Sequence, residues 1–356
     1  MDRNALLYYQ SARALRMPLT LREQIAGFEI NIGQRHYFFR GAETPFNHGS
    51  SVSVASNKYC MNKMLAACGF PVPNADAYSK EHFEKEKTEA LIRQLSFPLV
   101  VKPTVGTVQG TDVICNINTI AQLNAQMKKA FKRHNFLSVE EFHGGLNSYR
   151  VLVFFNKVIG VVQRFPARIV GDGVHTVSEL VAITNEERAS HNNTALGPIK
   201  MEEEFNIRLK ELNITPDTIP EDKETIVICY VCNSPRGGTT RSLGKKIDRG
   251  NARLLCRAAK ALDLNLVGFD VECSDIMLPM KAPRDVIIEA NHNPDITIHE
   301  NPMTGDKIQV TKIMLRRLIW KHPVAYLTGL CQSRSRAFYV KSAVVALVFV
   351  VWKSMV

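Results

Sequence analysis

The sequence lacks the features of a secreted, disulfide-bonded or multi-pass membrane protein. Its 356 residues contain eight cysteines scattered through apolar segments, without the dense spacing of a disulfide framework. The N-terminus lacks a continuous apolar core followed by a small-residue cleavage site, so we expect no secretory signal. Hydrophobic residues make up 45% of the chain and charged residues 22%, the proportions of an ordinary globular protein. We therefore expect a folded cytoplasmic chain of two or three packed units.

The last fifty residues lack acidic side chains. Residues 307–356 hold nine Lys and Arg and no Asp or Glu, so the formal charge of +11 falls to +2 for residues 1–306. Because the body is nearly neutral, we expect no specific binding of nucleic acid. The apolar run 343–352 has ten residues, about half of the roughly 20 that a helix needs to cross a bilayer. For residues 334–356 we therefore weigh contact with a membrane surface against a docked strand and a homodimer contact.

The sequence also lacks a P-loop, because GxxxxGK[ST] does not occur. Instead, Lys102 ends the apolar run 97–102 and precedes a loop that contains Gly106 and Gly110. A cation and free backbone N–H groups meet there, which is an arrangement suited to nucleotide phosphates. The same pattern also fits a hairpin with a solvated lysine, so it does not decide between the two readings.

Only one CxxC pair occurs, Cys229 and Cys232, and no second pair stands at zinc-ribbon spacing. We interpret these residues as structural thiols rather than as a metal or redox site. His175 and His299 are candidates for positioning a substrate or accepting a proton, with ordinary surface or core histidines as the alternative.

Acidic residues interrupt two apolar, strand-like runs. Asp270 lies in the run 266–272 and Glu289 in the run 286–291, where charged side chains need partners. Together with Asn291 they supply hard oxygen ligands for Mg²⁺, which nucleotide phosphates and water complete. A pair of buried salt bridges is the alternative interpretation.

Periodicity and turn residues predict a chain that mixes helices and strands. Ser56 or Asn57 can cap a first helix over 58–68, which ends at Cys68-Gly69. Further helices are expected over 80–95, 119–133, 177–188, 201–211, 249–262 and 306–320. Strands are expected over 97–102, 113–117, 137–142, 149–155, 157–164, 225–232, 266–273 and 285–290.

An ordered series of motifs runs from about residue 56 to 305. It consists of Lys58, Val101-Lys102-Pro103, Val139-Glu-Glu-Phe142, Tyr149-Arg150, Arg164, Gly171-Asp-Gly173, Arg236-Gly-Gly-Thr239, Gly268-Phe-Asp-Val271 and Ile288-Glu-Ala-Asn291. This series resembles the ATP-grasp carboxylate–amine ligases, and most closely the ATP-grasp modules of cyanophycin synthetase and of bifunctional glutathione synthetases.

The resemblance implies an α+β protein with the ATP-grasp fold, in which ATP lies between two α+β lobes. It implies a short lead-in (1–55), an N-terminal lobe (56–135), a C-terminal lobe with the metal site (136–322) and a basic, apolar tail (323–356).

Matching positions imply roles in nucleotide binding. Lys58 and Lys102 would hold phosphates, and the loop with Gly106 and Gly110 would act as a lid. Glu140 and Glu141 would lie on the hinge between the lobes and contact adenine through the backbone and ribose through a carboxylate.

Other positions imply roles in the chemistry. Asp270, Glu289 and Asn291 would bind Mg²⁺ or Mn²⁺, with two ions expected. Arg150, Arg164 and Arg236 would bind the acyl phosphate or the carboxylates of the substrate, since a guanidinium group fits both.

We therefore expect an ATP-dependent ligase that joins a small-molecule acid, such as an amino acid or small peptide, to an amine. Cyanophycin synthetase carries a large N-terminal domain and a second, Mur-ligase-like enzyme that have no counterpart here, so we do not expect polymer synthesis. The lid also has only two glycines. A small-molecule kinase and a non-catalytic nucleotide-binding scaffold are the alternatives.

Overall fold

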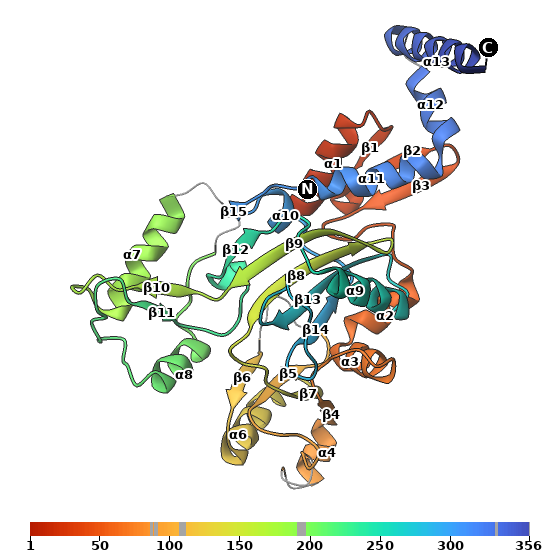
Figure 1. Cartoon of the computed structure of the whole chain (residues 1–356). Helices are drawn as coiled ribbons and strands as arrows, with labels where there is room; N and C mark the ends of the chain where they lie inside the picture. Colours follow the sequence, from red (N-terminus) through yellow and green to blue (C-terminus); the bar gives the residue numbers. More distant parts are fainter. Residues whose placement is uncertain (86–87, 89–91, 107–111, 191–196, 332–333, 356) are drawn as a thin grey trace. The chain divides into compact units, whose positions relative to one another are not determined.

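The structure, a computed structural model, describes the chain except residues 86–87, 89–91, 107–111, 191–196, 332–333 and 356 (Figure 1). Gly110 therefore lies outside the described residues. The chain forms two compact units. The terminal unit comprises residues 1–46, 295–300 and 309–356, and the sheet unit comprises residues 47–294 and 301–308. The four segments expected from the sequence divide the chain differently, and their boundaries stay a prediction.

The terminal unit joins the two ends of the sequence around one core. Its antiparallel sheet has the order β1(Leu19–Arg22)-β2(Gly27–Ile32)-β3(Arg35–Phe39), and its main helices are α1(Arg3–Ala14) and α11(Val310–Lys321). Tyr8 of α1 lies 5.1 Å from the ring of Phe39, and its hydroxyl donates to the sulfur of Met314 at 3.3 Å. The lead-in therefore obtains its core from a segment about 300 residues away.

Two further helices continue the terminal unit, α12(Pro323–Cys331) and α13(Arg334–Met355). The docked-strand alternative for this tail is wrong, because the segment is helical. Among the described residues, no helix is both long and apolar enough to cross a membrane.

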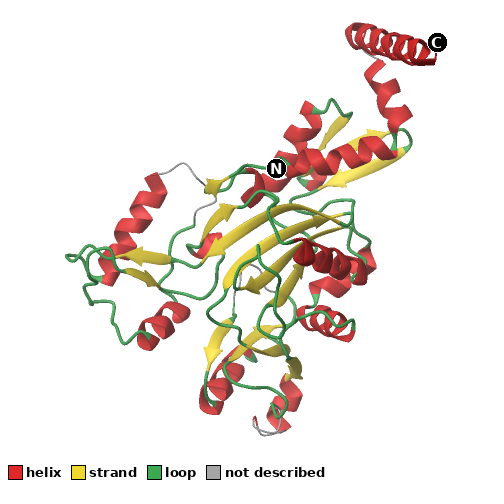
Figure 2. Ribbon diagram, viewed as in Figure 1, coloured by secondary structure: helices red, strands yellow, loops and turns green. Residues whose placement is uncertain are grey.

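The sheet unit contains a small lobe built on an antiparallel sheet of order β4-β7-β5-β6 (Figure 2). Its elements are β4(Ala75–Ser79), α4(Lys80–Lys85), β5(Leu99–Pro103), β6(Ile114–Ile117), α6(Ile120–Ala130) and β7(Phe136–Glu141). The apolar side of α6 packs on the sheet, with Leu123 and Met127 fully buried, as its helical spacing predicts. The helix expected over 80–95 is described as α4 only to Lys85.

The large lobe is a six-stranded sheet of order β14-β13-β8-β9-β12-β15, antiparallel except for the β12–β15 pair. Its strands are β8(Asn147–Phe154), β9(Lys157–Phe165), β12(Thr239–Ser242), β13(Leu266–Cys273), β14(Val286–Asn291) and β15(Thr304–Gly305). The helices α2(Gly49–Ser56), α3(Lys58–Ala67) and α9(Arg249–Ala261) belong to the same lobe, and α3 and α9 pack with the apolar side of β8, β13 and β14 in one core (Figure 1). Asn57 caps α3 by accepting from the backbone N–H of Cys60 at 3.0 Å, which confirms the predicted helix start.

A smaller layer lies beside the large lobe. It pairs β10(Arg168–Val170) with β11(Thr225–Val227) under α7(Val177–Ser190) and α8(Glu203–Glu211). The strand expected over 225–232 ends at Val227. The N–H of Ile228 still donates to the carbonyl of Ala167 at 3.0 Å, and beyond it the backbone N–H groups of Tyr230 and Val231 donate to the carboxylate of Glu204 at 2.7 and 2.9 Å instead of to a neighbouring strand.

The Gly171-Asp172-Gly173 motif is part of the framework of this layer. The N–H of Gly171 donates to the carbonyl of Glu224 at 2.7 Å, and Asp172 accepts from the N–H groups of Val174 and His175 ahead of α7. His175 therefore pairs with Asp172, and this carboxylate raises the pKa of the imidazole.

We predict that Gly171→Ala destabilises the chain by about 1–3 kcal/mol, because a Cβ at this position would lie 2.1 Å from the backbone oxygen of Glu221. Thermal unfolding measures the effect. Gly49→Ala is the matched control, since nothing lies within 4 Å of its Cβ position and alanine favours the helix that begins there. Equal melting temperatures for the two variants would contradict the close approach at Gly171.

Candidate active site

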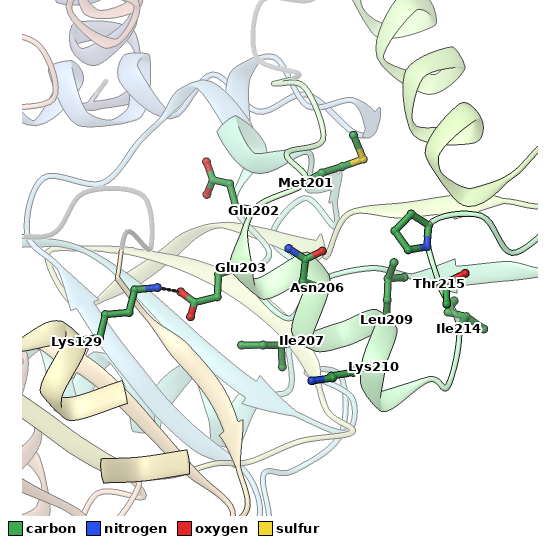
Figure 3. A pocket seen from close by; sticks show the side chains of 11 residues that line it. Lys129, Met201, Glu202, Glu203, Asn206, Ile207, Leu209, Lys210, Ile214 and Thr215 are labelled. Carbon is green, nitrogen blue, oxygen red and sulfur yellow. Dashed lines mark hydrogen bonds and ion pairs between the residues drawn. The ribbon is translucent and has the colours of Figure 1, made fainter. Parts of the chain in front are cut away.

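A cavity of ≈ 260 Å³ in the sheet unit is lined by strands of both lobes. Lys102 of β5 and Glu140 of β7 come from the small lobe, and Arg164 of β9, Glu272 of β13 and Ile288 of β14 come from the large lobe. The connection from β7 to β8 and the segment after β11 complete the walls. A larger hollow of ≈ 720 Å³ lies along α8, but it is lined by none of the predicted site residues (Figure 3).

Lys102 and Glu140 form a buried ion pair in this cavity. The Nζ of Lys102 lies 2.7 Å from Oε2 of Glu140, and the two side chains are only 7% and 4% exposed. The hydroxyl of Ser138 donates to the other oxygen of Glu140 at 2.9 Å. Register explains the contact, because Ser138 stands opposite Lys102 across the β5–β7 pair and Glu140 follows two residues later on the same face.

The neighbouring carboxylate, Glu141, also has protein partners. Its Oε1 accepts from the backbone N–H of Ser96, and its Oε2 accepts from the side-chain amide of Asn74, both at 2.9 Å. The segment after Glu141 joins the two lobes and lines the cavity, as expected for the hinge.

Asp270 is held between two arginines on the large sheet. Arg150 stands directly opposite Asp270 in the β8–β13 register and donates to both of its oxygens through Nε and Nη2. Nη1 of Arg164 lies 3.1 Å from Oδ2 of Asp270. Burial alone would raise the pKa of Asp270, but the two guanidinium groups outweigh it and hold the pKa below its usual range.

Glu289 and Asn291 lie on the same face of the sheet as Asp270. Glu289 stands opposite Asp270 in the β13–β14 register, and Asn291 stands opposite Gly268. The Nζ of Lys58 lies 2.5 Å from Oε1 of Glu289, and the side-chain amide of Asn291 donates to the carbonyl of Gly268 at 3.2 Å. The predicted metal set therefore shares one surface, and the salt-bridge alternative is also observed at both carboxylates.

Five charged groups gather on this face: Lys58, Arg150, Arg164, Asp270 and Glu289. Arg164 Nε is buried and has no hydrogen-bond partner among the described residues. The cluster is therefore not saturated, and an anion that brings further acceptors would complete it.

The donor set also fits a hard cation. Two carboxylates and one amide oxygen are the ligand types that Mg²⁺ prefers, although within the described residues no three His, Cys, Asp or Glu side chains form a metal-binding group by themselves. Binding of an ion by Asp270 and Glu289 would require their present cationic partners to turn toward an anion.

Two of the predicted site residues, Arg236 and Gly106, are not among the five charged groups on this face. Arg236 belongs to the short helical turn Ser234–Arg236. Its guanidinium group pairs with Glu202 at 2.9 Å and with Glu204 at 3.5 Å, and neither of these ion pairs involves Asp270. Gly106 has a φ of +77° and open space at its Cβ position, which fits a turn in a loop.

Sequence reasoning missed Glu272. It follows Asp270 by two residues on β13, so it shares the face of Asp270, and it lines the cavity. Burial raises its pKa to about 7, against the opposing effect of Arg164. The alternation in Phe269-Asp-Val-Glu272 is the sequence signal that could have identified it.

Three thiols also line the cavity: Cys115, Cys229 and Cys232. All are free, and burial raises the pKa of Cys229 to about 11 and that of Cys232 to about 12. Because such thiols stay protonated at neutral pH, they behave as small apolar wall residues. This agrees with their interpretation as structural thiols.

Comparison with known proteins follows this geometry. No protein-family model matches the chain. The fold matches the crystal structure of a bifunctional glutathione synthetase from Pasteurella multocida with a TM-score of 0.62 and 23% identity, over 90% of this chain and 44% of that one. The chain therefore has the ATP-grasp fold, which confirms the predicted fold class.

The sequence relatives are more specific. The chain is 30% identical over 272 residues to the glutathione biosynthesis bifunctional protein GshAB of Enterococcus faecalis, covering 74% of this chain and 35% of the relative. It is 28% identical over 282 residues to the cyanophycin synthetase of a Nostoc species, covering 78% and 30%. The chain is thus a homologue of one part of these ATP-grasp ligases and spans about a third of their length.

We predict that the pH dependence of stability reports the buried carboxyl of Glu272. Its pKa is raised from 4.5 to about 7, so the folded state binds a proton more tightly than the unfolded state, and this contribution to stability is lost as pH rises from about 4.5 through 7. Glu272→Gln has no carboxyl to ionise and does not lose this stability. The free energy of unfolding of the variant minus that of wild type should therefore increase by about 1–3 kcal/mol between pH 5 and pH 8. Urea unfolding at the two pH values measures this, and a constant difference would refute the burial of the carboxyl.

Proposed function

We propose that the chain is an ATP- and Mg²⁺-dependent ligase that joins a carboxylate to an amine through an acyl phosphate. The observation that carries the proposal is the cluster of Lys58, Arg150, Arg164, Asp270 and Glu289 on the sheet face beside the cavity. It combines cations for phosphoryl and carboxylate oxygens with carboxylates for a divalent ion. Homology to two ligases of this fold supports the same reading.

The reaction proceeds in two balanced steps. A carboxylate oxygen of the acid attacks the γ-phosphorus, the bond to the β–γ bridging oxygen breaks, and ADP leaves. The amine nitrogen then attacks the acyl carbon, loses a proton and displaces phosphate. Both steps place negative charge on oxygen atoms, so fixed cations that face those atoms lower the barrier.

The residues divide this work by position. Lys102 and Lys58 hold phosphate oxygens, while Arg150 and Arg164 hold the reacting carboxylate and the anionic adduct. ATP-grasp ligases use ATP and Mg²⁺ in general. Here Asp270, Glu289 and Asn291 would hold Mg²⁺ or Mn²⁺, with two ions expected, and the metal would neutralise the polyphosphate. Arg236 is a further candidate for binding a substrate carboxylate, and it would have to break its ion pair with Glu202 to do so.

Several arginines favour an acidic substrate, such as an amino acid or a small peptide, as the acid component. Eight free cysteines fit a protein of the reducing cytoplasm. For residues 334–356, a membrane surface and a second copy of the chain are the two candidate binding partners.

The ribose contact is best assigned to Glu272. All four carboxylate oxygens of Glu140 and Glu141 already have protein partners. Glu272 lines the same cavity from the opposite lobe, and Ser148, which stands opposite it on β8, satisfies one acceptor position of about four on a carboxylate. Two neighbouring hydroxyl groups of a ribose are donors that fit the rest.

A small-molecule kinase would use the same nucleotide cavity, and only the product distinguishes it from the ligase. The test is phosphate release from ATP and Mg²⁺ with pools of amino acids and short peptides, followed by mass spectrometry of each active pool. A product lighter by one water than the sum of its two substrates establishes the ligase. A phosphorylated product without an amide establishes the kinase.

We predict that Glu289→Gln lowers phosphate release in an active pool by at least about a hundredfold, because it removes one of two carboxylates that face the metal. Folding should persist, since the amide still accepts from Lys58. Glu221→Gln, an exposed substitution in the same unit, is the matched control. Unchanged activity of Glu289→Gln across magnesium concentrations would remove Glu289 from the metal site.

We further predict that direct ATP binding, measured by calorimetry without an acid or amine, weakens about tenfold in Glu272→Ala. Wild type should bind 2′-deoxy-ATP or 3′-deoxy-ATP more weakly than ATP, and Glu272→Ala should bind all three equally. Discrimination that survives in Glu272→Ala would assign the ribose to another residue, whereas the ligase assignment would still stand on product analysis.

A further inference from the structure

Helix α13 exposes apolar side chains in several directions. Val348, Phe349 and Val350 are 62%, 59% and 62% exposed. Because successive residues of a helix project 100° apart, these three side chains point in three separate directions. Val345 and Trp352, at 68% and 60%, are equally accessible. The exposed surface is therefore not a single stripe of the kind that packs on one neighbouring face.

The length of the apolar run limits what can cover it. Residues 343–352 carry no charge and extend about 15 Å along the helix axis. This is about half of the roughly 30 Å hydrocarbon core of a bilayer. The run is therefore too short to cross a bilayer, consistent with the absence of a membrane-crossing helix among the described residues, and it can instead lie along the surface with both of its ends near the headgroups.

The charge around the run has one sign. Lys341 precedes it and Lys353 follows it, while Arg334 and Arg336 lie one to two turns further toward the N-terminus of the helix. Residues 307–356 contain no Asp or Glu. An anionic surface is the complementary partner, and each Lys or Arg near such a surface contributes about 1 kcal/mol.

A second copy of the chain fits this segment poorly. It would cover one side of α13 and leave the other exposed valines in water. It would also bring together two basic segments that have no acidic group of their own to pair with. A lipid leaflet surrounds the helix on all sides and supplies the missing negative charge at the headgroups.

We propose that α13 binds an anionic lipid surface by lying along it, with residues 343–352 buried below the headgroups of one leaflet and the basic residues of the segment held at the headgroups. Lys353, which is exposed, can reach the headgroups by extending its aliphatic stem along the apolar helix. Trp352 lies next to Lys353, at the boundary between apolar and polar layers where tryptophan is favoured.

The test is flotation of the full chain with vesicles of phosphatidylcholine, with and without phosphatidylglycerol. Wild type should float with the anionic vesicles and less with the neutral ones, and salt should weaken the difference. The variant Val345→Ser/Val348→Ser/Val350→Ser should bind the vesicles at least about tenfold more weakly, because burial of apolar surface drives insertion. The variant Arg334→Ser/Arg336→Ser/Lys341→Ser/Lys353→Ser should lose the preference for anionic lipid.

The matched control is Lys245→Ser/Lys246→Ser/Arg253→Ser/Lys260→Ser, which removes four exposed cations from the sheet unit. It should float like wild type, and ATP binding should be unchanged in both α13 variants. Because the chain has two tryptophans, Trp320→Phe leaves Trp352 as the single emitter, and its emission should shift to the blue on anionic vesicles.

Equal flotation of wild type and the triple serine variant would overturn the proposal. So would a stable dimer in light scattering that the same triple variant dissociates while neither protein binds vesicles. If the control variant loses flotation as strongly as the α13 charge variant, binding depends on the total charge of the chain and not on α13, and this result would also overturn the proposal.

Discussion

The requirement that buried charges be paired governs the sheet unit. Asp270 is buried on β13, the second strand of the large sheet, and removal of one partner from such a pair costs about 3–5 kcal/mol because the remaining charge is buried alone. Arg150, Asp270 and Glu289 stand opposite one another on the adjacent strands β8, β13 and β14. The register of three strands therefore fixes the ion pairs, and the ion pairs resist any shift of register.

The alternation of side chains gives this sheet two chemically different faces. Val151, Phe269 and Val271 alternate with the charged residues and enter the apolar core under α3 and α9. A shift of one residue in β13 would exchange the two sets, placing carboxylates in the core and apolar side chains beside the cavity. The core thus positions the site, although no core residue touches the cavity from that face.

The sequence was sufficient where the physical cause is local. Asn57 caps a helix through its own side chain, and alternation places Asp270, Glu289 and Asn291 on one face once the strands pair. It was insufficient where the cause is distant. After Ile228 the chain stops pairing with its neighbour, and Glu204, 26 and 27 residues earlier, accepts the N–H groups of Tyr230 and Val231; no local pattern encodes that contact.

The same limit applies to the site. The motif resemblance predicts Arg236 as a site residue but gives no information on its tertiary partners. In the structure its guanidinium group forms ion pairs with Glu202 and Glu204. The resemblance also predicts Glu140 and Glu141 as hinge residues, but the contacts of the Glu141 carboxylate with the backbone N–H of Ser96 and the amide of Asn74 follow only from packing. In the terminal unit, the segments that pack with residues 1–46 begin only at Asp295, 249 residues after Phe46, so the sequence alone predicts a short lead-in.

The paired charges also explain why a nucleotide and a divalent cation must act together under the proposed function. Lys58 is held by Glu289, and Arg150 and Arg164 are held by Asp270. A free polyphosphate that recruited these cations would leave Asp270 buried and Glu289 half-buried without their partners, and a free metal ion would leave three cations unpaired. A polyphosphate bound with a metal ion would replace both sets of partners at once, because the anion would receive the cations while the carboxylates held the metal. Pairing would then be conserved, and the unpaired Nε of Arg164 would favour one further anion, the carboxylate that is to be phosphorylated.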